Sequence, residues 1–146
     1  MKKLLTNPIM EIIELEKDIQ VIAFQADSFP TGVLAAHQQA HTLFPPDGKR
    51  NYFGMSRPEK GGSIIYKACV EEMYEGEAQK HQREIQVIKA GHYYCVELEN
   101  FMENPHHIAQ IFTEILQQKD IDPEGYCVEW YDNENDEVKC MVRIVN

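Results

Sequence analysis

Residues 104–144 read NPHHIAQIFTEILQQKDIDPEGYCVEWYDNENDEVKCMVRI, and this stretch decides the fold because it contains one clear helix and two clear strands. Asn104 is a residue type that caps helix N-termini, and Pro105 suits the first helical position, where a missing N–H costs nothing. The apolar residues that follow have the spacing of one helix face: Ile108, Ile111, Phe112, Ile115 and Leu116. We therefore predict a helix that begins at Pro105 and packs on a core.

The end of the same stretch alternates like two β-strands, one over residues 125–131 and one over residues 138–144. The four residues that point to one side of the second strand are apolar: Val138, Cys140, Val142 and Ile144. The residues between the strands, DNEND at 132–136, are typical of a solvated hairpin turn. The pattern predicts an antiparallel hairpin.

The first half of the chain repeats this order in a weaker form. A strand over residues 19–26 precedes a helix opened by Pro30, with strands over 51–56 and 63–72 after it. The apolar stripe of that helix consists of Val33, Leu34, Ala40 and Leu43. In the second half, a strand over 91–98 precedes the helix of Pro105. Two β-α-β-β units, over residues 19–72 and 91–144, are therefore expected.

This order predicts an α+β fold with pseudo-two-fold symmetry. The two units would form an antiparallel sheet with both helices on one face, and a ligand cleft would lie between the units. A further strand is expected over residues 9–15, before the first unit.

Composition indicates one globular domain over residues 1–146, because 43% of the residues are hydrophobic and 26% are charged. The net charge is −10, and the 14 Lys and Arg residues are scattered, so we expect neither direct nucleic-acid binding nor membrane binding. The apolar run at Leu4 and Leu5 is too short for a secretion signal, which makes the cytoplasm the expected location. The four cysteines, Cys69, Cys95, Cys127 and Cys140, are predicted to be reduced and buried.

Glu129 is the first candidate for chemistry, because it stands mid-strand among apolar and aromatic residues. Strand alternation places Cys127, Glu129 and Tyr131 on one face, and Trp130 on the other. A carboxylate among aromatic rings suits a flat cation, and a carboxyl with a raised pKa can act as a general acid or base. From the pattern alone, a solvent-facing Glu129 without function is an equal alternative.

The other polar and aromatic residues give weaker signals. Tyr93 and Tyr94 fit either packing or ligand contact, and Tyr66 fits a core position. His37 and His41 have the i, i+4 spacing of metal ligands, but the catalytic Glu of an H-E-x-x-H site is missing and no third ligand can be named. We therefore predict no metal site and no cofactor.

With these residues in view, the sequence resembles the GyrI-like small-molecule-binding family. The pieces that carry the resemblance are Phe29-Pro30 before a helix, Tyr66-Lys67-Ala68-Cys69-Val70, Ile88-Lys89-Ala90-Gly91-His92-Tyr93, Val128-Glu129-Trp130-Tyr131 and Cys140-Met141-Val142-Arg143-Ile144. The family includes effector-binding domains of multidrug-responsive transcription regulators. The residues before Ile19 are too few for the regulators' helix-turn-helix, so the chain resembles the stand-alone form.

The resemblance implies a central cleft in which Glu129 contacts cationic aromatic ligands, with Tyr131, Tyr93 and Trp130 as further ligand-binding candidates. Three functions stay open. The chain could capture a small amphipathic or cationic compound, hydrolyse a reactive cyclopropane-type compound with Glu129 as acid or base, or act as a gyrase-inhibitor-like interaction module. The sequence also leaves open a homodimer, a protein partner and cooperation with a separate transcription regulator.

Overall fold

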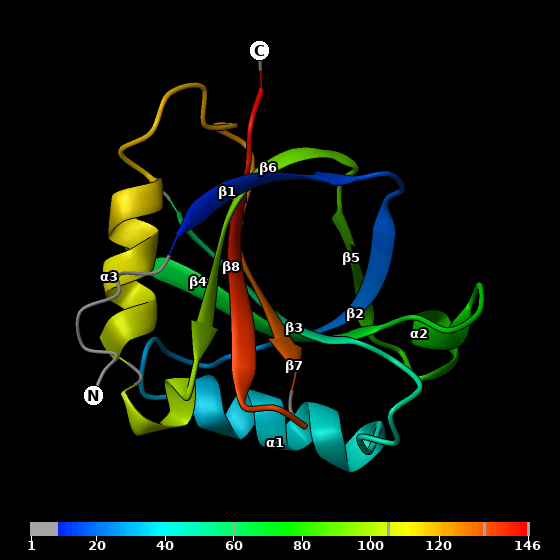
Figure 1. Ribbon diagram of the computed structural model, residues 1–146. Helices are drawn as coiled ribbons and strands as arrows, with labels where there is room; N and C mark the ends of the chain where they lie inside the picture. Colours follow the sequence, from blue (N-terminus) through cyan, green and yellow to red (C-terminus); the bar gives the residue numbers. More distant parts are fainter. Residues whose placement is uncertain (1–8, 60, 105, 133, 146) are drawn as a thin grey trace.

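The computed structural model describes residues 9–145 apart from 60, 105 and 133 (Figure 1). In chain order the elements are β1 (Met10–Leu15), β2 (Ile19–Gln25), α1 (Val33–Leu43), β3 (Tyr52–Pro58), β4 (Ile64–Glu71), α2 (Glu77–Lys80), β5 (Glu84–Ile88), β6 (Gly91–Glu99), the 3-10 turn η2 (Phe101–Glu103), α3 (His106–Ile115), β7 (Cys127–Asp132) and β8 (Glu137–Arg143). The predicted α+β class and the two β-α-β-β units are confirmed.

The strands form one antiparallel sheet in the order β1-β6-β8-β7-β3-β4-β2-β5. The order is symmetric about the β3–β7 pair, because β2-β4-β3 of the first unit mirrors β6-β8-β7 of the second. The edge strands are exchanged between the units. β1 directly precedes β2 in the chain but pairs with β6, whereas β5 directly precedes β6 but pairs with β2. The sheet curls strongly, so that these edges come round toward each other (Figure 1).

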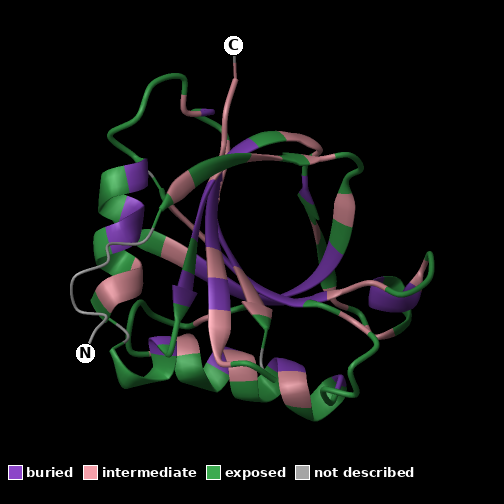
Figure 2. Ribbon diagram, viewed as in Figure 1, coloured by how far each residue is buried: buried purple, intermediate pink, exposed green. Residues whose placement is uncertain are grey.

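Both main helices pack on the same, outer face of the sheet, as predicted. Ala36 and Ala40 of α1 cluster with β2 and β4 side chains such as Ile22 and Val70. The buried face of α3 joins a separate cluster with β6 and β8. The inner face has a core of its own, which includes Val21, Phe53, Met55, Val128 and Met141. Buried residues accordingly follow the central strands and the sheet-facing sides of the helices (Figure 2).

The helix boundaries and faces differ in part from the prediction. α1 begins three residues after Pro30, at Val33, and its stripe is wrong at Leu34 and Leu43, which are 68% and 41% exposed. Small residues face the sheet instead, which lets the helix approach it closely. In α3, Ile111, Phe112 and Ile115 are buried, but Leu116 lies past the helix end and is 50% exposed. Pro105 lies outside the described residues.

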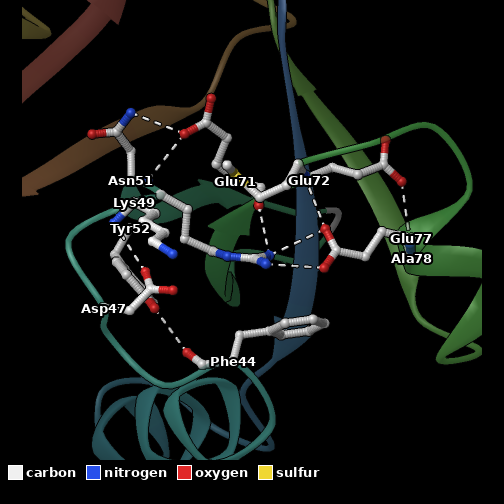
Figure 3. A network of polar contacts seen from close by, with 11 residues as sticks. Phe44, Asp47, Lys49, Asn51, Tyr52, Glu71, Glu72, Glu77 and Ala78 are labelled. Atoms are coloured by element: carbon white, nitrogen blue, oxygen red, sulfur yellow. Dashed lines mark hydrogen bonds and ion pairs between the residues drawn. The ribbon is translucent and has the colours of Figure 1, made fainter.

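A polar network anchors the segment between α1 and β3 to α2. Arg50 donates two hydrogen bonds to the Glu77 carboxylate, at 3.1 and 3.0 Å, and one to the backbone oxygen of Glu71 (Figure 3). These bonds and the Met73 N–H lower the pKa of Glu77, although burial opposes them. The Arg50 guanidinium also lies 4.8 Å from the centre of the Phe44 ring. The network holds the loop on which one of the cavities described below is built.

All four cysteines are unbonded in the structure. Cys69, Cys95 and Cys140 are buried and Cys127 is partly buried. Burial raises the pKa of the Cys95 and Cys127 thiols to about 11. Among the described residues, no helix combines the length and apolarity needed to cross a bilayer.

Candidate functional site

Glu129 lies at the centre of the molecule, where the two units meet. It belongs to β7 and pairs in register with Gly54 of β3, across the symmetric seam of the sheet. Its side chain points to the helix-bearing face, on the same side of the strand as Tyr131, as strand alternation predicted, and only 8% of the residue is exposed. Glu129 is therefore buried at the seam and does not lie on an open solvated surface.

Two tyrosines hydrogen-bond the Glu129 carboxyl. The Tyr66 hydroxyl of β4 donates to Oε1 at 2.9 Å, and the Tyr131 hydroxyl donates to the same oxygen. His37 of α1 extends the network, because its Nε2 lies 2.7 Å from the Tyr66 hydroxyl oxygen. Since Tyr66 has one hydroxyl hydrogen and gives it to Glu129, His37 must be the donor in that contact. The network thus joins β4, β7 and α1.

Gly54 makes the close approach of these groups sterically allowed. A Cβ atom at position 54 would lie 2.1 Å from the Tyr66 hydroxyl oxygen and 2.6 Å from Glu129 Oε1. Both separations are far below van der Waals contact. A glycine inside a strand often marks such an approach, and here it provides the space in which the hydroxyl and the carboxyl meet.

Burial sets the protonation behaviour of the network. It raises the pKa of Glu129, and the hydrogen bonds from Tyr131 and Tyr66 oppose that rise. Burial and then the repulsion from His41 lower the pKa of His37 to about 4, so His37 is neutral at pH 7. Burial and the nearby Glu129 charge raise the pKa of both Tyr66 and Tyr131 well above the ordinary value. Both phenols therefore remain hydrogen-bond donors at neutral pH.

The surroundings of the carboxyl are aromatic. Phe29 stacks on Tyr66 with ring centres 5.9 Å apart, and the ring centres of Phe101 and Tyr131 lie 5.5 Å apart. The His37 ring meets the Tyr131 ring edge-on at 5.4 Å. Within the described part of the chain, Glu129 has no salt-bridge partner. The arrangement is therefore suited to attract a cation or to transfer a proton.

The structure brings together only part of the predicted set of site residues. Tyr131 meets Glu129, whereas Tyr93 and Trp130 belong to the inner face, on the other side of the sheet. The Tyr93 hydroxyl donates to the Lys89 backbone oxygen at 2.5 Å. The Trp130 N–H donates to Asn51 at 3.2 Å. Ligand binding by all four residues stays a prediction.

Two cavities lie at the junction of the units, and neither is lined by Glu129 itself. The acidic cavity, of about 460 Å³, is lined by Tyr131, Trp130 and Tyr52 together with Glu97, Asp132, Glu134, Glu137, Arg50 and Lys139. Tyr131 thus lines this cavity and also hydrogen-bonds the Glu129 carboxyl. The basic cavity, of about 340 Å³, is lined by residues that include Tyr93, Arg57 and Arg143.

Sequence reasoning missed three members of the network: Tyr66, His37 and Gly54. Tyr66 was assigned to the core, and it is indeed only 2% exposed, but its hydroxyl binds Glu129. His37 and His41 were considered as metal ligands, and the described residues contain no cluster of three or more His, Cys, Asp or Glu that could hold a metal. The sequence signal for Gly54 is a glycine inside a predicted strand, which often marks the close approach of other groups.

Comparison with known proteins gives matches in structure alone. No protein-family model matches the sequence, and no curated protein matches it. Among solved structures, SAV2435 bound to tetraphenylphosphonium matches with a TM-score of 0.66 at 12% identity, over 94% of each chain. An integron cassette protein from the mobile metagenome of Vibrio cholerae matches with a TM-score of 0.61 at 12% identity, over 93% of this chain and 95% of that one.

A third solved structure is similar as well. The C-terminal domain of EcmrR matches with a TM-score of 0.58 at 10% identity, over 95% of this chain and 97% of the domain. At these identities the likeness establishes the fold. The curled antiparallel sheet with its helices on one face is therefore the fold of the GyrI-like proteins.

Proposed function

We propose that this chain is a cytoplasmic binding domain of the GyrI-like family that captures an amphipathic or cationic aromatic compound. The observation that carries the proposal is the buried Glu129 carboxyl, which is surrounded by aromatic rings and has no cationic partner among the described residues. That a protein of the same fold, SAV2435, is bound to tetraphenylphosphonium supports this ligand class.

A buried carboxylate without a counter-ion favours an organic cation for two physical reasons. Taking the charge out of water is costly, so a cation that enters the site recovers a strong attraction in a region of low dielectric. The ring faces of Tyr66 and Tyr131 add cation–π attraction of roughly 0.5–2 kcal/mol each. A flat or aryl-bearing cation gains both the charge attraction and the cation–π attraction.

The acidic cavity provides a route to the carboxyl. Its four carboxylates, on Glu97, Asp132, Glu134 and Glu137, outnumber Arg50 and Lys139, so the cavity attracts positive charge. Tyr131 forms part of its wall and also hydrogen-bonds Glu129. In the proposal, a cation enters this cavity beside Tyr131, and rotation of the Tyr131 side chain brings it to Glu129.

Binding of tetraphenylphosphonium to the Glu129→Gln variant tests the proposal. The substitution keeps the shape and removes the charge, and two opposite unit charges about 6–8 Å apart attract by roughly 2–3 kcal/mol at an effective dielectric constant of about 20. Calorimetric affinity should therefore fall by about tenfold to a hundredfold, since 1.4 kcal/mol corresponds to tenfold. Glu114→Gln, an exposed substitution on α3, is the matched control and should bind like the wild type. Equal affinity of Glu129→Gln and wild type would contradict the proposal.

Hydrolysis is a second candidate function, because burial raises the pKa of Glu129 and a carboxyl with a raised pKa can act as a general acid. In that case Glu129→Gln would still bind a cyclopropane-type substrate but would lose its turnover. Equal turnover by both proteins would remove Glu129 from any catalytic role. The gyrase-inhibitor-like role and a homodimer stay predictions, which analytical ultracentrifugation with and without gyrase would check.

A further inference from the structure

The basic cavity has the features of a second binding site, separate from Glu129. It lies on the inner face of the sheet, and its apolar lining residues Met55, Ile88 and Val128 belong to the inner core. Glu129, Tyr66 and His37 face the opposite side. Its volume of about 340 Å³ falls within the range of roughly 300–1,000 Å³ that is usual for small-molecule pockets.

Hydrogen bonds fix Arg143 in this cavity and leave some of its guanidinium N–H donors unused by the described residues. Its Nε donates to the Ala90 backbone oxygen at 2.9 Å, and its Nη1 donates to Asp122 Oδ2 at 3.1 Å. Its Nη2 donates to no residue in the described part of the chain. The other Asp122 oxygen accepts the Glu124 N–H at 2.9 Å, so each oxygen of the Asp122 carboxylate has a hydrogen-bond donor. Asp122 therefore positions Arg143 and does not leave a free anion in the cavity.

Arg57 lines the same cavity and also has N–H donors that are not used within the described residues. Its Nη1 donates to the Glu124 backbone oxygen at 3.1 Å, and its Nε contacts the exposed Glu59 carboxylate at 3.3 Å. The guanidinium lies 4.5 Å from the centre of the Tyr126 ring, which fixes its plane. Its Nη2 donates to none of the described residues. Two oriented guanidiniums with unused N–H groups therefore line one pocket, as in sites that recognise carboxylates.

The charge of the cavity also differs in sign from that of the rest of the molecule. The chain carries a net charge of −10, yet Arg57, Lys89 and Arg143 line this cavity against Asp122 and Glu124. Lys89 forms no salt bridge with any described residue, and it is exposed. With Arg143 paired to Asp122, Arg57 and Lys89 remain against Glu124, so the lining carries one more positive than negative charge and favours an anion.

We propose that the basic cavity binds a small aromatic organic anion, of the aryl carboxylate class. The flat ring would lie on the apolar surface of Met55 and Val128, beside Tyr126. The carboxylate would accept hydrogen bonds from the free Nη2 groups of Arg57 and Arg143. This site is independent of cation capture at Glu129, because the two use opposite faces of the sheet and ligands of opposite charge.

Titration of 2-naphthoate by isothermal calorimetry tests this proposal, with 2-naphthamide as the neutral analogue of the same ring system. We expect the wild type to bind 2-naphthoate at least tenfold more tightly than 2-naphthamide. Arg57→Gln should weaken naphthoate binding by tenfold or more, which corresponds to about 1.4 kcal/mol. Lys49→Gln removes one positive charge from an exposed position outside the cavity and should stay within twofold of the wild type.

A second variant and a competition experiment keep the test decisive. Arg143→Lys retains the charge beside Asp122 but loses the planar fork, so it should also weaken naphthoate binding while its melting temperature stays near that of the wild type. Saturating tetraphenylphosphonium should not displace naphthoate. Equal affinity for the acid and the amide, an unchanged affinity of Arg57→Gln, or displacement by the cation would each overturn the proposal.

Discussion

Replacing Gly54 by Ala should strongly destabilise the protein, because the added methyl group would occupy the space in which Tyr66 meets Glu129. The new Cβ would lie 2.1 Å from the Tyr66 hydroxyl oxygen, so one of the two must move by more than 1 Å to reach contact distance. Overpacking of this kind costs about 1–3 kcal/mol. Loss of the tyrosine's hydrogen bond to the carboxylate adds about 1.5–3 kcal/mol.

These costs are offset in part by the lower backbone freedom of alanine, which contributes about 0.4–1 kcal/mol. A net loss of about 2–5 kcal/mol is expected, which is a large part of the typical 5–15 kcal/mol of a folded domain. Urea unfolding followed by circular dichroism measures it. Gly125→Ala is the matched control, because its Cβ would come no nearer than 3.4 Å to any atom outside its chain neighbours.

A double-mutant cycle with Tyr66→Phe separates the steric cause from a general intolerance of position 54. Tyr66→Phe removes the atom that the new methyl would strike, although the ring carbon Cζ would still lie 2.9 Å away. Gly54→Ala combined with Tyr66→Phe should therefore cost at least about 1 kcal/mol less than the sum of the single changes. Additive costs, or a Gly54→Ala protein within 1 kcal/mol of the wild type, would refute the reasoning.

Three further predictions concern protonation and thiols. The pKa of His37 is near 6.5 in the unfolded chain and about 4 in the folded protein, so the folded protein loses about 3 kcal/mol of stability as the pH falls from 6.5 to 4. His37→Gln should lack this part of the pH dependence. Equal stability–pH profiles for the variant and the wild type would contradict the prediction. Because the pKa of Glu129 is raised, affinity for tetraphenylphosphonium should increase with pH as the carboxyl ionises, and a pH-independent affinity would argue against a role for its charge. All four cysteines should react with Ellman's reagent after non-reducing denaturation, and Cys127 should react first in the native protein because the others are buried; a native disulfide would contradict the expected cytoplasmic location.

The repeated units could be predicted from the sequence because each carries its own local signals. Strand alternation and a proline near the start of each helix are readable within windows of ten to fifteen residues. β5 could not be found in this way, although Glu84–Ile88 alternates, because its short, half-exposed pattern is stabilised by pairing with β2, which is distant in sequence. The predicted face of α1 is right at Ala40, but Ala36 contacts the sheet in place of the larger Leu34 and Leu43, which are exposed.

The candidate site could be predicted only along its own strand. Alternation places Glu129 and Tyr131 on one side of β7, and the structure agrees. Tyr66 and Gly54 reach Glu129 through strand pairing across the sheet, and no local pattern reports which residues become neighbours in that way. Trp130 illustrates the opposite case: alternation already placed it away from Glu129, and only the resemblance to a known family grouped the two residues.

The exchanged edge strands have a consequence for how the chain can fold. Since β1 completes the second unit and β5 completes the first, neither half of the sequence can satisfy both edges of its own sheet. A chain of half this length would form the same sheet only as a strand-swapped pair of identical subunits, and the segment between β4 and β5, which contains α2, joins two such halves into one molecule. Both halves should therefore unfold in a single transition, and cutting the chain between residues 72 and 84 should leave two fragments that fold only together.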